Sequence, residues 1–116
     1  MAGAERNIDH LEQILELVAA IRRRTAQLDR KGFEADRDES DLAAFRLAHI
    51  GEASRKLSDE VRSRHPHIDW RSIYGMRNVI AHDYGAILPR LLWTVISKDL
   101  DPLEMACRQE LERLSL

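Results

Sequence analysis

The feature that most constrains this chain is the spacing of its apolar residues, which recur at three- and four-residue steps along most of the sequence. This spacing gathers apolar side chains on one face of an α-helix, whereas a half-buried strand would alternate them every second residue. No stretch alternates in that way, and no internal repeat is visible. The sequence therefore predicts an all-α fold, an antiparallel up-and-down bundle of four main helices plus a short helical segment.

Residues that favour helix ends give the expected boundaries. The first two helices are expected over residues 5–28 and 41–63, with a polar loop at 29–40 between them. Ser40 or Asp41 can cap the second of these helices, because their side-chain oxygens accept hydrogen bonds from the first turn. Three further helices are expected to begin near residues that suit a helix N-terminus: Asp69, Pro89 and Asp101.

The length and charge of the chain limit its class. At 116 residues it is expected to form one domain, residues 1–116, with little material to spare for a deep private pocket. The net charge of −2 does not indicate nucleic-acid binding, which usually requires a basic domain. If RNA is the substrate, the basic character must therefore be local. Of the 18 basic residues 15 are Arg, which suits phosphates and interfaces better than Lys does.

The compartment is inferred from what the sequence lacks. Cys107 is the single cysteine, so no disulfide framework is available. No apolar stretch approaches the length of a membrane span, and no basic segment followed by an apolar run opens the chain. A cytoplasmic protein without a membrane partner is expected.

The strongest functional signal is one segment of eight residues: Arg77-Asn78-Val79-Ile80-Ala81-His82-Asp83-Tyr84. Arg77 keeps its proton under physiological conditions and can bind two phosphate oxygens at once. His82 can accept and return a proton near neutral pH, because an unperturbed imidazole has a pKa of about 6.5. Together they could bind a phosphodiester and transfer a proton without a metal, so both are candidate catalytic residues.

Helix geometry decides whether these two side chains can act together. On a continuous helix, five residues of separation place them about 140° apart, because each residue turns by about 100°. Arg77 and His82 therefore converge on one substrate only if the helix ends near Ala81, or if the site lies across a dimer axis. One imidazole per chain also cannot be acid and base at once, which is a second reason to expect two chains at one site.

Two further residues are expected to position the substrate. Asn78 can hydrogen-bond a phosphate or orient His82, and Tyr84 offers a hydroxyl donor or a ring for base stacking. No metal or cofactor is expected. The alternation His65-x-His67-x-Asp69 is interpreted as a solvated loop, and no glycine-rich phosphate loop occurs. His10 and His49 lie within expected helices and have no matching ligand pair.

Residues 65–84 resemble the central segment of the HepT-like ribonuclease toxins of the HEPN superfamily, whose motif is Arg, four residues, then His-x-Tyr. Leu92-Trp93 and Asp99-Leu100 also resemble the helix that follows in that family. The resemblance implies a homodimeric helical toxin that cuts RNA without metal in a cleft between subunits. It also implies an MntA-like nucleotidyltransferase antitoxin that transfers AMP onto the motif tyrosine, which corresponds to Tyr84.

The leading hypothesis is thus a metal-independent endoribonuclease, the toxin of a HepT/MntA-type pair, with a 2′,3′-cyclic phosphate product. Arg77 and His82 would be catalytic, and Asn78 and Tyr84 would position the RNA. The alternative is a non-catalytic helical adaptor that binds a nucleotidyltransferase partner and serves as its modification acceptor. A regulatory dimer with a vestigial site is a third possibility, against which the intact motif weighs.

Overall fold

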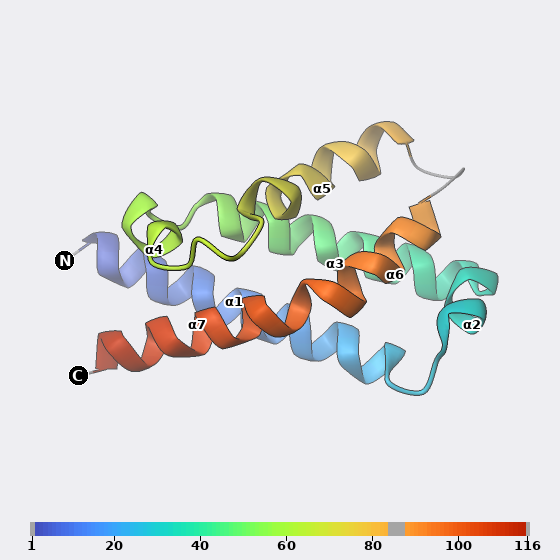
Figure 1. Ribbon diagram of the computed structural model, residues 1–116, viewed down its shortest axis with the longest axis horizontal. Helices are drawn as coiled ribbons and strands as arrows, with labels where there is room; N and C mark the ends of the chain where they lie inside the picture. Colours follow the sequence, from blue (N-terminus) through green and yellow to red (C-terminus); the bar gives the residue numbers. More distant parts are fainter. Residues whose placement is uncertain (1, 84–87, 116) are drawn as a thin grey trace.

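The computed structural model describes residues 2–83 and 88–115, and within these ranges it contains seven helices and no strand (Figure 1). The helices are α1 (Ala2–Thr25), α2 (Arg30–Ala35), α3 (Arg37–Arg55), α4 (Asp59–Ser63), α5 (Trp70–Asp83), α6 (Leu88–Lys98) and α7 (Leu100–Ser115). The predicted all-α helical bundle is confirmed. The described helices contain no apolar run long enough to cross a membrane.

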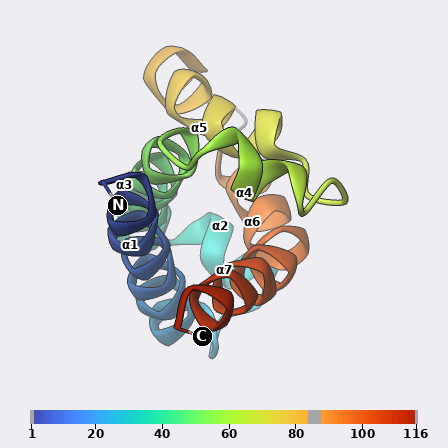
Figure 2. The same ribbon diagram turned by 90° about the vertical axis from the view of Figure 1, so that its left-hand side faces the viewer.

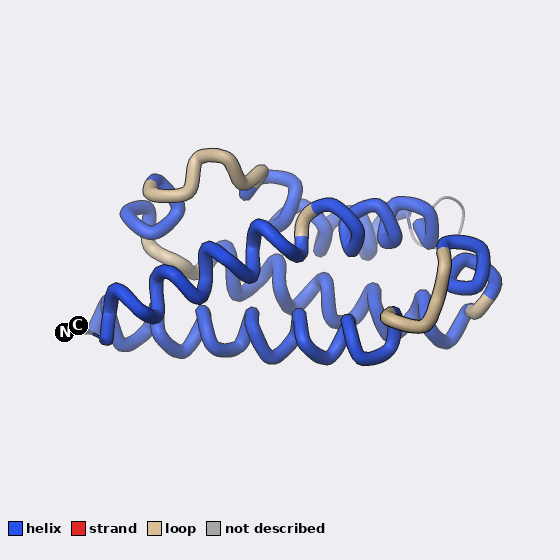
Figure 3. The backbone as a smooth tube through the Cα atoms, turned by 60° about the horizontal axis from the view of Figure 1, so that its bottom comes forward, coloured by secondary structure: helices blue, strands red, loops and turns tan. Residues whose placement is uncertain are grey.

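The main helix contacts of the bundle join α1, α3, α5 and α7. α3 packs against both α1 and α5, α1 also packs against α7, and α6 packs against α2 and α7. α1 and α5 run in one direction along the bundle and α3, α6 and α7 in the other, and the start of α1 lies at the same end of the bundle as the end of α7 (Figures 1 and 3). Large side chains that are fully buried fill the space between the helices, and they include Leu11, Ile14, Phe33, Ile50, Leu92 and Leu103.

The predicted loop at residues 29–40 is wrong, because this region contains α2 and the beginning of α3. Asp29 caps α2 by accepting a hydrogen bond from the Gly32 backbone N–H at 2.7 Å. Phe33 then anchors the short helix, because its ring is fully buried and lies 5.2 Å from the ring of Trp93. One buried aromatic residue thus stabilises a six-residue helix that has too few apolar positions to show a periodicity.

The predicted second helix over residues 41–63 is wrong at its start, and the structure interrupts it before its end at Ser63. Asp36 caps α3, which begins before both expected caps, and Ser40 instead donates its hydroxyl hydrogen bond to the Phe33 carbonyl. α3 ends at Arg55, and α4 begins after Ser58, whose hydroxyl accepts from the Val61 N–H at 3.3 Å. The capping residues decide these boundaries, because each one satisfies a backbone N–H that has no partner within its helix.

The predicted helix starts near Asp69, Pro89 and Asp101 are confirmed. Asp69 accepts hydrogen bonds from the Ser72 N–H at 3.2 Å and the Ser72 hydroxyl at 2.7 Å, as an N-cap does. Hydrogen bonds from Ser72 lower the pKa of the Asp69 carboxyl. Pro89 lies in the first turn of α6, and Asp101 lies in the first turn of α7. Cys107 is buried in the core, and this burial raises the pKa of its thiol to about 12.

Gly51 allows α3 and α5 to approach each other closely. A Cβ atom at this position would lie 2.7 Å from the Ile73 carbonyl oxygen and 3.4 Å from the Tyr74 Cα. Both of these are backbone atoms, so no side chain can rotate to make room. The close contact fixes where α5 crosses α3, and therefore which α3 residues lie beside the motif.

We expect Gly51→Ala to destabilise the fold by about 1–2 kcal/mol, because overpacking outweighs the gain of about 1 kcal/mol in helix propensity. Gly75 is the matched control, since a Cβ on this α5 residue would meet nothing within 4 Å. Gly75→Ala should stabilise the protein by up to about 1 kcal/mol. Urea unfolding of both variants measures the two signs. Equal effects of the two substitutions would contradict the close packing at Gly51.

The predicted solvated loop at residues 65–69 is wrong for His65. Its ring is buried, and its Nε2 lies 2.7 Å from Oε2 of Glu110 on α7. Glu110 also accepts hydrogen bonds from Arg64, the shortest of them 2.5 Å from Nη2 to Oε1. Only 3% of the Glu110 side chain is exposed. A buried carboxylate is tolerated here because both of its oxygens have donors, and it ties the loop before α5 to α7.

The stability that Glu110 contributes to the fold should be lost in acid. The hydrogen bond from Arg64, followed by that from His65, lowers the pKa of the Glu110 carboxyl below its ordinary value of 4.5. A carboxyl with a lowered pKa in the folded state contributes stability above the unfolded pKa and loses it as the pH falls through the folded pKa. We expect Glu110→Gln to lose about 2 kcal/mol at pH 7 and to flatten the decline below about pH 4.5. Unfolding curves at pH 7 and pH 3.5 test this, and equal losses at both values would contradict it.

Candidate active site

The helix that carries the motif is anchored at its start and leaves the bundle at its end. Trp70, Ile73 and Met76 are buried, and the Trp70 indole donates to the His65 carbonyl at 3.0 Å. None of residues 77–82 is fully buried, and Figure 2 shows the last turns of the helix standing away from the other helices. The second half of α5 therefore presents most of its surface to solvent.

Arg77 lies on this exposed half, with 64% of its side chain accessible. Its Nη1 donates a hydrogen bond of 2.9 Å to Oε2 of Glu52 on α3. Oε1 of Glu52 accepts a second hydrogen bond, at 2.8 Å, from Nη2 of Arg55. Among the described residues this is the hydrogen bond that Arg77 makes, so most of its five N–H donors remain directed to solvent. One N–H group of the guanidinium is thus bound to Glu52, and the other N–H groups are available to a ligand.

Glu52 remains ionised at neutral pH. The hydrogen bond from Arg55, together with the positive charges of Arg55 and Arg77, lowers the pKa of its carboxyl. One carboxylate between two guanidinium groups leaves a net positive charge at this point of the surface. The local basic character that an RNA substrate would require therefore exists here, although the whole chain carries a net charge of −2.

Arg77 and Glu52 lie in a groove between α3 and α5. It has a volume of about 330 Å³ and is lined by Ala48, His49, Glu52 and Arg77. The His49 ring is exposed and packs against the ring of Phe45, with 4.5 Å between the two centroids and 52° between the planes. The groove therefore combines a guanidinium, an imidazole and a carboxylate, all of them accessible.

His82 is exposed in the last turn of α5. Because α5 continues as far as Asp83, Arg77 and His82 lie on one continuous helix, and their side chains leave it about 140° apart. The first sequence-based alternative, a helix that ends near Ala81, is therefore wrong. His82 is not among the residues that line the groove at Arg77. Within one described chain, the structure does not bring the two predicted catalytic groups together.

The remaining predicted site residues have different outcomes. Asn78 is exposed on α5, next to Arg77 in sequence, where its amide is accessible to a ligand. Tyr84, the predicted positioning residue and AMP acceptor, lies outside the described residues. In the described ranges, no three side chains from His, Cys, Asp and Glu are grouped closely enough to hold a metal ion.

Sequence reasoning missed the α3 side of the site. The sequence offers no ligand pair for His49, and so gives no reason to place this residue in a site. Phe45, His49 and Glu52 are spaced by four and three residues, so they share one face of α3. This spacing was visible in the sequence, but nothing there indicated that the same face would lie beside Arg77.

Comparison with known proteins gives a consistent family. Residues 14–110 match the family described as "Ribonuclease HepT-like". The chain is similar to "Probable ribonuclease HepT" of Thermococcus cleftensis, with 30% identity over 83% of this chain and 87% of the relative. It is also similar to "Putative RNase TTE0752" of Caldanaerobacter subterraneus subsp. tengcongensis, with 29% identity over 90% and 93% of the two chains. No solved structure matches the chain significantly.

The matched segment covers most of the chain and includes α3, α5 and α6 together with Arg77 and His82. The protein therefore belongs to the Ribonuclease HepT-like family, and the resemblance found in residues 65–84 is confirmed.

Proposed function

We propose that this protein is a metal-independent endoribonuclease. The observation that carries the proposal is Arg77, which lies in an open groove with most of its donors unused, five residues before an exposed His82 on a helix whose last turns stand away from the bundle. Membership of the Ribonuclease HepT-like family supports it, as do the ribonuclease names of the relatives.

The proposed reaction uses the neighbouring 2′-hydroxyl of the RNA as nucleophile. His82 removes the proton of this hydroxyl as O2′ bonds to phosphorus, or it protonates O5′ as the P–O5′ bond breaks. The products are a 2′,3′-cyclic phosphate and a free 5′-hydroxyl. Negative charge grows on the non-bridging oxygens during attack, and the Arg77 guanidinium stabilises it. Asn78 and Tyr84 position the phosphate and the adjoining nucleotide.

We further propose that the active site forms between two copies of the chain. Arg77 and His82 point in different directions from one helix, so a single α5 does not present both to one phosphate. A two-fold axis near the end of α5 would bring Arg77 of one copy opposite His82 of the other. Two copies also supply two imidazoles, so that one can act as base while the other acts as acid.

In the cell we propose that the protein is a toxin, controlled by an MntA-like nucleotidyltransferase antitoxin. AMP attached to the Tyr84 hydroxyl would add a bulky anion to the motif and exclude the phosphates of RNA by charge and size. Mass spectrometry of the protein produced together with the nucleotidyltransferase is expected to show AMP on Tyr84. The same modification should abolish RNA cleavage.

The deciding experiment is RNA cleavage by the purified protein in the presence of EDTA. We expect undiminished cleavage and product fragments that end in 2′,3′-cyclic phosphate and begin with a 5′-hydroxyl. Loss of cleavage with EDTA would refute the metal-free mechanism, and 5′-phosphate products would refute attack by the 2′-hydroxyl. A protein that binds the nucleotidyltransferase and leaves every RNA intact would instead be the non-catalytic adaptor.

A further inference from the structure

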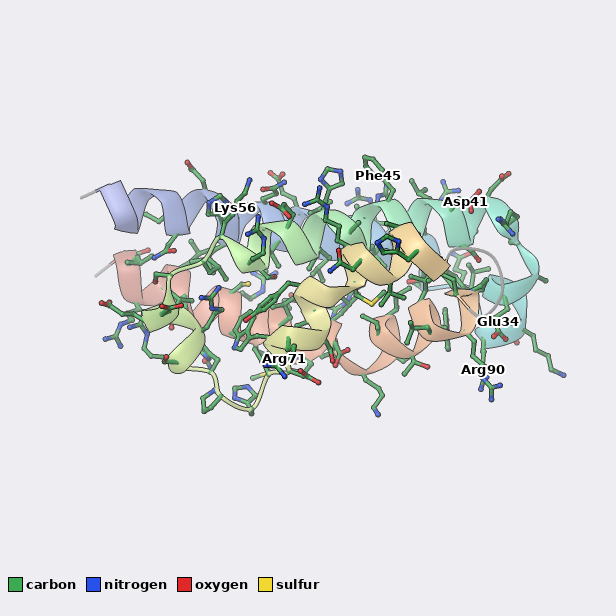
Figure 4. All side chains as sticks on the ribbon, turned by 90° about the horizontal axis from the view of Figure 1, so that it is seen from above. Glu34, Asp41, Phe45, Lys56, Arg71 and Arg90 are labelled. Atoms are coloured by element: carbon green, nitrogen blue, oxygen red, sulfur yellow. The ribbon has the colours of Figure 1, made fainter. Side chains whose placement is uncertain are left out.

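Phe45 is unusual for its exposure and for its neighbour. Across the described residues, only Phe45 and Met105 are large hydrophobic side chains that stay exposed, at 61% and 62%. Phe45 packs one part of its ring against His49, and it projects outward from α3 at the level of the last turns of α5 (Figure 4). A tilted aromatic pair on the surface leaves ring faces available to a flat ligand.

The aromatic pair lies on the side of the Arg77–Glu52 contact toward which α5 continues to His82. Glu52 on α3 touches Arg77, and Phe45 precedes Glu52 by seven residues, or roughly 10 Å along the helix. His82 follows Arg77 by five residues, or roughly 7 Å along α5. Since α3 and α5 run in opposite directions (Figure 1), both displacements lead the same way from the Arg77–Glu52 contact. His49 joins the two parts, because it lines the Arg77 groove and contacts Phe45.

We propose that Phe45 and His49 form a stacking site for an unpaired base of single-stranded RNA, next to the phosphate that Arg77 binds. This proposal rests on the proposed function and identifies the substrate as unpaired RNA. An aromatic face beside a guanidinium matches one nucleotide, which offers a flat ring and an anion a short distance apart. In a duplex the base faces are covered by their neighbours, so a double-stranded RNA would not reach the pair.

The charges around the pair favour a nucleotide over an apolar protein surface. Arg55 and Arg77 flank Glu52, and their side chains are 59% and 64% exposed. An apolar partner that covered Phe45 and His49 would adjoin the Arg77 guanidinium in the same groove, at a cost in desolvation. A phosphate instead gains by approaching them. The second copy of the chain remains the competing occupant, and the experiment below separates it from RNA.

The test is binding of a single-stranded 2′-O-methyl RNA oligonucleotide, which cannot be cleaved because its 2′-oxygen carries no proton. Fluorescence anisotropy gives the dissociation constant. Phe45→Ala should weaken binding about tenfold, as expected for the loss of one stacked base. Phe45→Trp should retain or improve it. Met105→Ala is the matched control, since it removes an equally exposed side chain from α7, and it should leave binding unchanged.

The contribution of the His49 imidazole to RNA binding is tested with a control at another exposed histidine. His49→Ala should weaken binding of the same oligonucleotide severalfold, whereas His67→Ala, at an exposed histidine outside the groove, should not. A duplex of the same sequence should bind Phe45→Ala and the unmodified protein equally. These differences identify unpaired RNA as the ligand.

Three results would overturn the proposal. Equal oligonucleotide binding by Phe45→Ala and Met105→Ala would remove the stacking site and leave the ribonuclease function standing. A Phe45→Ala protein that sediments as a monomer where the unmodified protein is a dimer would show that Phe45 packs against the second copy. Equal losses for duplex and single strand would exclude an unpaired base. Weaker binding by Phe45→Ala in a protein that cuts no RNA would refute the ribonuclease and keep the stacking site.

Discussion

Replacing Arg77 with alanine is expected to reduce the rate of RNA cleavage about 10²- to 10³-fold, because the charge that grows on the phosphate oxygens loses its fixed counter-charge. His82→Ala should reduce the rate about 10²- to 10⁴-fold, because no group then transfers the proton. Single-turnover cleavage of a short RNA measures both effects. Arg77→Lys should recover part of the rate, since a point charge remains but the fork that binds two oxygens is lost.

The loss of activity should not reflect loss of structure. Arg77 is exposed, and an exposed ion pair such as Arg77–Glu52 contributes about 0–1 kcal/mol to stability. The free energies of unfolding of Arg77→Ala and His82→Ala should therefore lie within about 1 kcal/mol of that of the unmodified protein. Arg90→Ala, at an exposed arginine on α6 outside the Arg77 groove, is the control for removing one positive charge. Cleavage by the His82→Ala protein at the unmodified rate would end the ribonuclease mechanism described above.

Mixing the two inactive proteins is expected to restore cleavage if the site is shared between copies. A dimer of one Arg77→Ala chain and one His82→Ala chain would contain one site with both groups intact and one site with neither. After free exchange of subunits, half of the dimers are of this mixed kind. The mixture should therefore reach at most about one quarter of the unmodified activity, and less where the restored site also needs the second imidazole, from two preparations that are each inactive.

The opposite arrangement gives a different result. If Arg77 and His82 of the same chain served one site, every site in the mixture would lack one of the two groups, and no activity would return. The comparison needs exchange to be complete, which can be followed by mass spectrometry of differently tagged chains. Restored activity at any level well above that of the separate variants supports a shared site. Continued inactivity after complete exchange contradicts it.

The sequence predicted the helices and missed the features that divide them. Apolar periodicity gave the all-α class, because long amphipathic runs carry a strong signal, and residues that favour helix ends gave the starts near Asp69 and Pro89. It missed α2, whose formation depends on the burial of Phe33 against α6, and the interruption after Arg55, which depends on the cap at Ser58. Short helices are set by single caps and tertiary contacts, and neither of these gives a periodic pattern.

The candidate site shows the same division. Arg77, Asn78 and His82 could be selected from the motif, and the structure finds all three exposed on one helix. The partners on α3 could not be selected, because the position at which α3 crosses α5 depends on the backbone contact at Gly51. That contact places Glu52 within hydrogen-bonding distance of Arg77 and brings His49 into the groove. The α3 side of the site, with Glu52 and His49, therefore depends on a long-range packing contact.

The placement of the chain ends has a practical consequence for every assay proposed above. The beginning of α1 and the end of α7 lie together, and the last turns of α5 lie toward the opposite end of the bundle (Figure 1). A purification handle or a fluorophore attached at those helix ends would therefore lie away from the last turns of α5, where the proposed site forms. Surface immobilisation through those ends should leave the groove facing the solution.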